Sequence, residues 1–148
     1  MKSFTTAVFL ALALPLLAGA QVLNPVKWEY SAKKIGQGQY ILHMTAVIEP
    51  GWHVYAQDAG EGPVPTSFKF KKAPGTVFSG KVREVGKLEK QYDKNFASVL
   101  KYYESKVDFV QYVKTEPGTK SVKGTVEYMV CDNHQCLQPK DIDFSIQL

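Results

Sequence analysis

Two cysteines, Cys131 and Cys136, are the residues of this chain best suited to chemistry, and they are its only cysteines. Residues 132–135 separate them. A disulfide closing a ring of about six residues stabilises a fold by about 2 kcal/mol, and the gain grows with the length of the loop. A disulfide formed mainly for stability would join distant parts of the chain. The short spacing therefore favours a pair that opens and closes by thiol–disulfide exchange.

The N-terminus has the features of a cleavable export signal. An apolar run over residues 7–17 is followed by small residues at 18–20 (Ala-Gly-Ala), the pattern of a cleavage site. We predict cleavage before Gln21, which divides the chain into a signal peptide, residues 1–20, and one domain, residues 21–148. The run is too short for a membrane span, and no other segment approaches that length. We expect a periplasmic or secreted protein without a span in the mature chain, in a compartment that permits disulfides.

Charge and motifs exclude several function classes. The formal net charge is +4, and the lysines are scattered along the chain. Scattered lysines are typical of a solvated surface, so no nucleic-acid partner is expected. The sequence contains no Gly-x-Ser-x-Gly elbow, no Walker loop and no His-Glu-x-x-His helix. The cysteine pair therefore remains the main candidate site.

The elements that must position this pair are predicted from the apolar pattern. Residues 40–48 and 122–130 alternate between apolar and polar side chains, which indicates β-strands. Roughly eight short strands, separated by glycine and proline turn signals, predict an antiparallel β-sandwich. Residues 92–103 differ, because their apolar side chains have helical spacing. We interpret that segment as a long connection with room for one helical turn.

The strand pattern places the cysteines on a hairpin. Cys131 ends one predicted strand and Pro139 precedes the next, so residues 132–135 form the tip. Facing residues near a hairpin tip have Cα atoms about 4.5 to 5.5 Å apart, within reach of a disulfide. A protonated His134 would favour a thiolate and Asp132 would oppose it, and the sequence leaves open which effect is larger.

The C-terminal run carries a family resemblance. Residues 126–139 contain a strand, a cysteine, a short polar loop, a second cysteine and a proline-containing return. This run resembles the N-terminal periplasmic domain of the thiol:disulfide interchange protein DsbD. Residues 50–55 (Pro-Gly-Trp-His-Val-Tyr) resemble that family's Gly-aromatic-x-x-Tyr strand, and residues 93–96 (Asp-Lys-Asn-Phe) resemble its cap loop. The resemblance covers most of residues 24–148.

The resemblance implies an immunoglobulin-like β-sandwich that exchanges reducing equivalents with thioredoxin-like periplasmic proteins, a protein-disulfide reductase-type relay for which we expect no cofactor. By position, Cys136 matches the cysteine that forms mixed disulfides, and Cys131 matches its resolving mate. Phe96 matches the cap-loop aromatic that covers the disulfide until a partner displaces it. The residues predicted to flank the pair and to bind partners are Phe96, Tyr55, His53 and His134.

Three features depart from the family pattern. The loop between the cysteines is one residue shorter than in the best-known member. Lys94 and Asn95 stand where acidic residues are expected before the cap aromatic, and Asp93 lies one position further away. We expect that no membrane-embedded domain and no thioredoxin domain follow Leu148, so that the chain is a free-standing module. Its electron donor would then be a separate membrane protein, or the module would have lost the relay role.

Two alternatives to exchange remain open. The disulfide could be inert, in a secreted β-sandwich with a binding or structural role. Alternatively, Cys131, His134 and Cys136 could supply three ligands to copper(I) or zinc, although our preferred assignment contains no metal. The fourth ligand would then be Met129 or His53. The reduction potential of the pair separates exchange from an inert bond, and titration of the reduced protein with either metal tests the last alternative.

Overall fold

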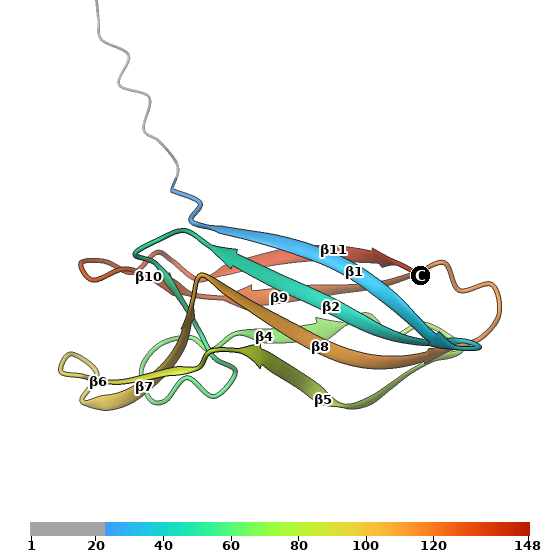
Figure 1. The fold of residues 1–148 in the computed structure, drawn as a ribbon, viewed down its shortest axis with the longest axis horizontal. Helices are drawn as coiled ribbons and strands as arrows, with labels where there is room; N and C mark the ends of the chain where they lie inside the picture. Colours follow the sequence, from blue (N-terminus) through green and yellow to red (C-terminus); the bar gives the residue numbers. More distant parts are fainter. Residues whose placement is uncertain (1–22) are drawn as a thin grey trace, which may run out of the picture.

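The computed structural model describes residues 23–148, and the predicted signal peptide and its cleavage site lie outside them. The described residues form eleven β-strands and no helix (Figure 1). The strands are β1 Val26–Gly36, β2 Gln39–Ile48, β3 His53–Tyr55, β4 Ser67–Phe70, β5 Thr76–Gly86, β6 Glu89–Asp93, β7 Ser98–Glu104, β8 Lys106–Thr115, β9 Ser121–Tyr128, β10 Val130–Cys131 and β11 Lys140–Gln147. Within this range, no helix is present that could cross a membrane.

The strands pair antiparallel in three sheets. Their strand orders are β1-β2-β8-β5, β11-β9-β4 and β10-β3-β7-β6. The first two sheets face each other, and the third lies at the end of the molecule opposite the C-terminus (Figure 1). The predicted antiparallel β-sandwich is therefore confirmed.

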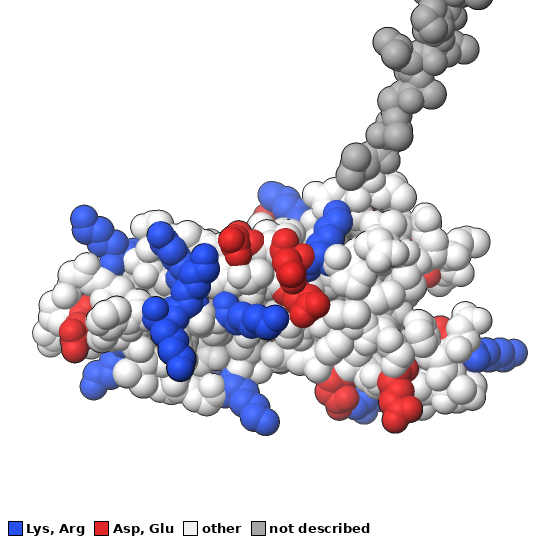
Figure 2. Space-filling view, turned by 180° about the vertical axis from the view of Figure 1, so that it is seen from behind, with Lys and Arg blue, Asp and Glu red and all other residues white. Residues whose placement is uncertain are grey.

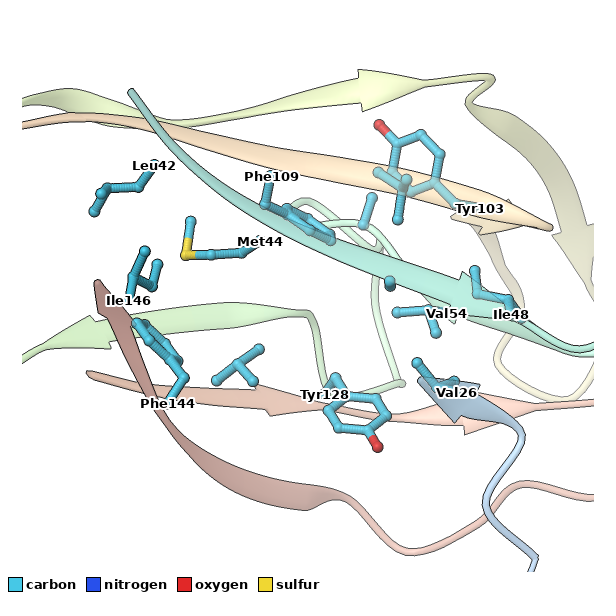
Figure 3. Close-up of a cluster of buried hydrophobic side chains, with 14 of the residues drawn as sticks. Val26, Leu42, Met44, Ile48, Val54, Tyr103, Phe109, Tyr128, Phe144 and Ile146 are labelled. Carbon is cyan, nitrogen blue, oxygen red and sulfur yellow. The ribbon is translucent and has the colours of Figure 1, made fainter. Parts of the chain in front are cut away.

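The core lies between the two facing sheets because one side of each strand is apolar. Leu42, Met44 and Ala46 alternate along β2 and are fully buried. Phe109 of β8 lies at the centre, with its ring 5.0 Å from that of Phe68 and 5.8 Å from that of Trp28. Buried side chains of β9 and β11 close the other side (Figure 3). Interlocking aromatic rings of this kind hold the two sheets in a defined register.

The third sheet continues strands of the sandwich. Ser105 alone separates β7 from β8 and has a positive φ of 62°, which bends the chain from one sheet to the other. Met129 alone separates β9 from β10. The strands of the third sheet are thus anchored in the packed core, although the sheet itself lies at the molecular end.

The sequence interpretation of residues 92–103 was wrong. This segment contains the end of β6, a turn and nearly all of β7, and none of it is helical. Phe96 lies in the turn, Leu100 is buried and Val99 is exposed on the opposite face. The apparent helical spacing therefore arises from a hairpin whose turn interrupts the alternation. The predicted number of strands was also too low.

Charged side chains of both signs share the surface. Figure 2 shows lysine and arginine side chains next to acidic ones on one face of the molecule. Lys69 and Lys123 lie on the same sheet as Glu127 and Asp143. This mixture agrees with the solvated surface expected from the sequence.

Candidate functional site

The two cysteines form a disulfide across the start of a tight loop. Their Cα atoms are 4.0 Å apart, and the two residues face each other in an isolated antiparallel bridge. The amide of Leu137 donates to the carbonyl of Val130 at 2.9 Å, which closes the hairpin below the disulfide. Cys131 is 2% exposed, whereas Cys136 is exposed to solvent. One sulfur-bearing residue of the pair is therefore reachable from outside and the other is covered.

Asp132 organises the loop between the cysteines. Its Oδ1 accepts hydrogen bonds from the amides of His134 and Gln135, each at 2.7 Å. Its own amide donates to the carbonyl of Gln135 at 2.9 Å. The two amide donors lower the pKa of the Asp132 carboxyl, so it is ionised at neutral pH. The side chain thus serves as a local turn former and leaves a negative charge beside the disulfide.

The cysteine loop borders a cavity of about 520 Å³. The opposite wall is the β6–β7 hairpin, and the floor is the outer face of β3 and β7. Figure 1 shows both loops projecting at the same end of the molecule. Side chains from four strands and two loops line it: His53, Tyr55, Leu100, Tyr102, Phe96, His134 and both cysteines are among them. The site residues predicted from the sequence therefore lie around one cavity.

Phe96 lines this cavity beside the buried cysteine. Its half-buried ring packs against a small cluster formed by Tyr55, Leu100 and Cys131 with Ala59. Asp93 shapes the turn, because its Oδ1 accepts from the amide of Phe96 at 3.1 Å and from that of Asn95 at 2.7 Å. The ring occupies the space that a side chain at position 62 would need.

Gly62 makes this packing possible. A Cβ at Gly62 would overlap the ring of Phe96, and the φ of Gly62 is +119°, a conformation that favours glycine. The turn itself includes Ala97 with a φ of 50°, an uncommon value for a residue with a side chain. The absence of a side chain at Gly62 therefore leaves room for the ring of Phe96.

A line of polar atoms approaches the covered cysteine. The hydroxyl of Tyr55 donates to Sγ of Cys131 at 3.3 Å, and Nε2 of His53 lies 3.4 Å from the same hydroxyl. The ring of His53 also packs on that of Tyr102, with centroids 4.5 Å apart. Tyr102 is held by a hydrogen bond from its hydroxyl to Oε1 of Gln91 at 3.0 Å.

Burial sets the protonation of these groups. It lowers the pKa of His53 from its usual value of 6.5, and the nearby carboxylates of Glu104, Asp132 and Asp93 only partly oppose this effect. Burial, aided by Asp93, raises the pKa of Tyr55 to about 12. At neutral pH the site therefore contains a neutral imidazole and a protonated phenol.

In the oxidised domain the cysteines do not offer the thiolates that zinc or copper(I) binds, because both sulfurs are joined in the disulfide. The metal alternative concerns the reduced protein and stays a prediction. Residues 23–148 contain no group of three or more His, Cys, Asp or Glu side chains arranged to hold a metal ion.

Sequence reasoning missed several residues of the cavity. No site role had been predicted for Tyr102, Leu100 or Gln91, all of which line the cavity. Position in the chain gives no signal for these residues, because they reach the cysteines only through the pairing of β7 with β3 and β6. Gly62 lies outside the cavity lining, and its contact with Phe96 was likewise not predicted.

Comparisons with known proteins agree with this geometry. The family model for the N-terminal domain of the thiol:disulfide interchange protein DsbD matches residues 20–147. The structure is similar to the N-terminal periplasmic domain of ScsB from Proteus mirabilis, with a TM-score of 0.55, 18% identity, and coverage of 83% of this chain and 44% of that chain. The chain thus spans less than half of that relative. None of the curated protein sequences compared with the chain matches it.

A second solved structure is similar over nearly its whole length. It is described as the complex between the DsbD N-terminal and the PilB N-terminal domains from Neisseria meningitidis. The TM-score is 0.54, the identity is 16%, and the match covers 84% of this chain and 87% of that chain. At 16–18% identity, these two similarities show that the folds are alike and show nothing further.

Fold and site together define an immunoglobulin-like β-sandwich domain with a disulfide at one end and an aromatic side chain, Phe96, packed against the cluster that contains Cys131. The chain belongs to the family of the N-terminal domain of the thiol:disulfide interchange protein DsbD.

Proposed function

We propose that this domain relays reducing equivalents to or from thioredoxin-like proteins through Cys131 and Cys136. The observation that carries the proposal is the asymmetry of the pair: Cys136 is exposed in an open cavity, and Cys131 is 2% exposed beneath Tyr55 and Phe96. An attacking thiolate can therefore reach one sulfur far more easily than the other.

The exchange proceeds in two balanced steps. The thiolate of a reduced partner attacks Sγ of Cys136, the disulfide breaks, and Cys131 leaves as a thiolate. A second thiolate of the partner then attacks the partner's own sulfur in the mixed disulfide and releases Cys136 as a thiolate. The partner is oxidised to a disulfide, and the domain gains two electrons and, on protonation, two thiol protons. The reverse sequence passes the electrons to an oxidised acceptor.

Phe96 controls access in this scheme. An aromatic ring over a disulfide excludes small thiols and oxidants, and a docking protein can displace it. The partner-binding surface then consists of the two walls of the cavity, with His53, Tyr55 and His134 beside the sulfurs. The DsbD N-terminal domain of Neisseria meningitidis forms a complex with a PilB domain, which supports a protein as the docking partner.

We further propose that the domain begins at Gln21 and acts in the periplasm, supplied by a separate membrane donor. Support comes from the export pattern of the first twenty residues and from the periplasmic domain of ScsB to which the chain is similar. Sequencing the N-terminus of the exported protein tests the cleavage site.

Trapping of a mixed disulfide tests the relay. Cys131→Ser should form a covalent adduct through Cys136 with a thioredoxin-like protein, and the matched Cys136→Ser variant should form none. A reduction potential above about −300 mV supports exchange, whereas a lower value indicates an inert structural bond. Failure of Cys131→Ser to trap any thioredoxin-fold protein while Cys136 reacts with small thiol reagents would refute the relay.

A further inference from the structure

The buried cysteine of the pair, Cys131, has the more demanding chemistry of the two. Cys131 has to leave as a thiolate when the disulfide opens, and it has to attack as a thiolate when the disulfide closes. Burial raises the free energy of a thiolate, and the carboxylates Asp93 and Asp132 beside the cavity add to that cost. Ionisation of Cys131 therefore needs a specific proton acceptor.

The structure places such an acceptor at the end of a hydrogen-bonded line. His53 and Tyr55 lie two residues apart on β3, so their side chains project from the same face of the sheet. The pairing of β3 with β10 sets His53 opposite Cys131, and its pairing with β7 sets His53 opposite Glu104. The contacts of 3.4 Å from His53 to Tyr55 and 3.3 Å from Tyr55 to Cys131 are thus fixed by three adjacent strands.

We propose that His53 accepts the proton of Cys131 through the Tyr55 hydroxyl when the disulfide closes, a role that rests on the proposed exchange function. In the mixed disulfide, the thiol of Cys131 gives its proton to the oxygen of Tyr55 while the hydroxyl proton of Tyr55 moves to Nε2 of neutral His53. The thiolate of Cys131 then attacks Sγ of Cys136. The new S–S bond forms, and the partner leaves as a thiolate.

Reversal of the same path serves the opening direction. In that direction the neutral imidazole of His53 first takes a proton from solvent, and the imidazolium then passes it through Tyr55 to the departing Cys131, so protons balance in both directions. Tyr55 can carry the proton because a phenol has one donor and two acceptor positions. Its raised pKa of about 12 keeps it protonated before and after each transfer.

The surroundings of His53 suit a base of this kind. Its ring lies between the rings of Tyr55 and Tyr102, at centroid distances of 5.2 Å and 4.5 Å. Burial lowers its pKa, which keeps the resting imidazole neutral and ready to accept a proton. The titratable and charged groups that face it or line the same cavity come from all the surrounding elements: Glu104 and Tyr102 on β7, Tyr92 and Asp93 on β6, Lys94 in the β6–β7 turn, Tyr55 on β3, and Cys131, Asp132, His134 and Cys136 on the cysteine hairpin. The three carboxylates would stabilise the imidazolium once it forms.

Disulfide closure can be followed without any protein partner. The reduced full-length domain is treated with an aromatic disulfide of the dithionitrobenzoate type, which forms a mixed disulfide at exposed Cys136. Attack by Cys131 then releases a coloured thiolate in a separate phase. The rate of this second phase, measured as a function of pH, reports the ionisation of Cys131.

We expect the closure rate of the wild type to show the titration of one histidine below the pKa of the thiol. His53→Gln should remove that inflection and slow closure at neutral pH by about 100-fold, the lower end of general-base catalysis. Tyr55→Phe should do the same, because it breaks the path and leaves the ring in place. His43→Gln is the matched control: His43 pairs with Asp108 on β2 and β8, outside the cavity, and should leave the profile unchanged.

The chain has only three histidines, so the variants of His43, His53 and His134 together test every histidine that could cause the inflection. An inflection that persists in His53→Gln, or that disappears in His134→Gln instead, overturns the proposal, and so does a wild-type profile without a histidine titration. The relay can fail independently. Closure that depends on His53 in a protein that traps no thioredoxin-like partner would refute the relay and retain the role of His53.

Discussion

The two ends of this domain are built differently. One cluster of seventeen buried hydrophobic residues fills the sandwich and extends into the third sheet through Val54, Tyr103 and Val130 (Figure 3). The cysteine end contains a separate cluster of four, one of which is Cys131. Apolar burial is the main source of stability, so most of the folding free energy comes from the sandwich. The cysteine end is free to carry polar atoms, an open cavity and a covering ring. Substitutions at the two ends should therefore have separable effects on stability and on thiol chemistry.

The largest effect on stability is expected at the centre of the sandwich. Phe109→Ala removes a fully buried ring that contacts Trp28 and Phe68, and it should lower the free energy of unfolding by about 3–5 kcal/mol. Denaturant unfolding measures this loss. The reduction potential of the folded variant should stay at the wild-type value, and a shifted potential would contradict the separation of the two ends.

Removal of the disulfide should cost less. The double variant Cys131→Ser/Cys136→Ser should lose about 2 kcal/mol of unfolding free energy, because the ring that the disulfide closes is short. Denaturant unfolding of the oxidised wild type, the reduced wild type and the variant measures it. A loss as large as that of Phe109→Ala would show that the cysteine end contributes to folding as much as the core.

Truncation of the covering ring should change reactivity more than stability. Phe96→Ala should lower the free energy of unfolding by about 1 kcal/mol, since the ring is only half buried. Reduction of the disulfide by dithiothreitol should become about tenfold faster, which corresponds to about 1.4 kcal/mol in the barrier. Tyr112→Ala, an exposed aromatic on the outer face of β8, is the matched control and should leave the reduction rate unchanged. Equal rates for all three proteins would mean that Phe96 does not guard the sulfurs.

The smallest effect is a pH dependence of stability. The folded state lowers the pKa of His53 below 6.5, so between the folded pKa and 6.5 the unfolded chain binds more protons than the folded domain. Stability should therefore be full above pH 6.5 and decline as the pH falls through the folded pKa. His53→Gln should remove this contribution, which is seen as a smaller difference between unfolding midpoints at neutral and at mildly acidic pH. An unchanged difference would show that burial does not disfavour the imidazolium.

Sequence reasoning succeeded where the signal was local. The alternation of residues 40–48 and 122–130 predicted strands that the structure contains, although the second is divided at Met129 into β9 and β10. The spacing of the cysteines predicted their disulfide. It failed at β5, where the register shifts between Ser79 and Arg83 and the alternation is lost. It failed again at residues 92–103, where a hairpin turn imitated the period of a helix.

The site was predictable only in part, because sequence patterns report local structure and the site also depends on strand pairing. Cys131, Cys136 and the residues of the adjoining loop lie close together in the sequence. Tyr102 and Gln91 reach them through strand pairing that no local pattern encodes. The family resemblance supplied Phe96, His53 and Tyr55, and the structure places all three at the cavity. The contact between Tyr55 and Cys131 was visible only in the folded protein.

Gly62 has a consequence for how such a domain can be tuned. Gly62 does not line the cavity. Phe96 can pack against the cluster around Cys131 only because position 62 has no side chain. A single methyl group at this position would displace the ring of Phe96 and expose the disulfide more fully to solvent. The substitution would change none of the atoms that take part in electron transfer. Protection and reactivity can therefore evolve, or be engineered, as independent settings of the same module.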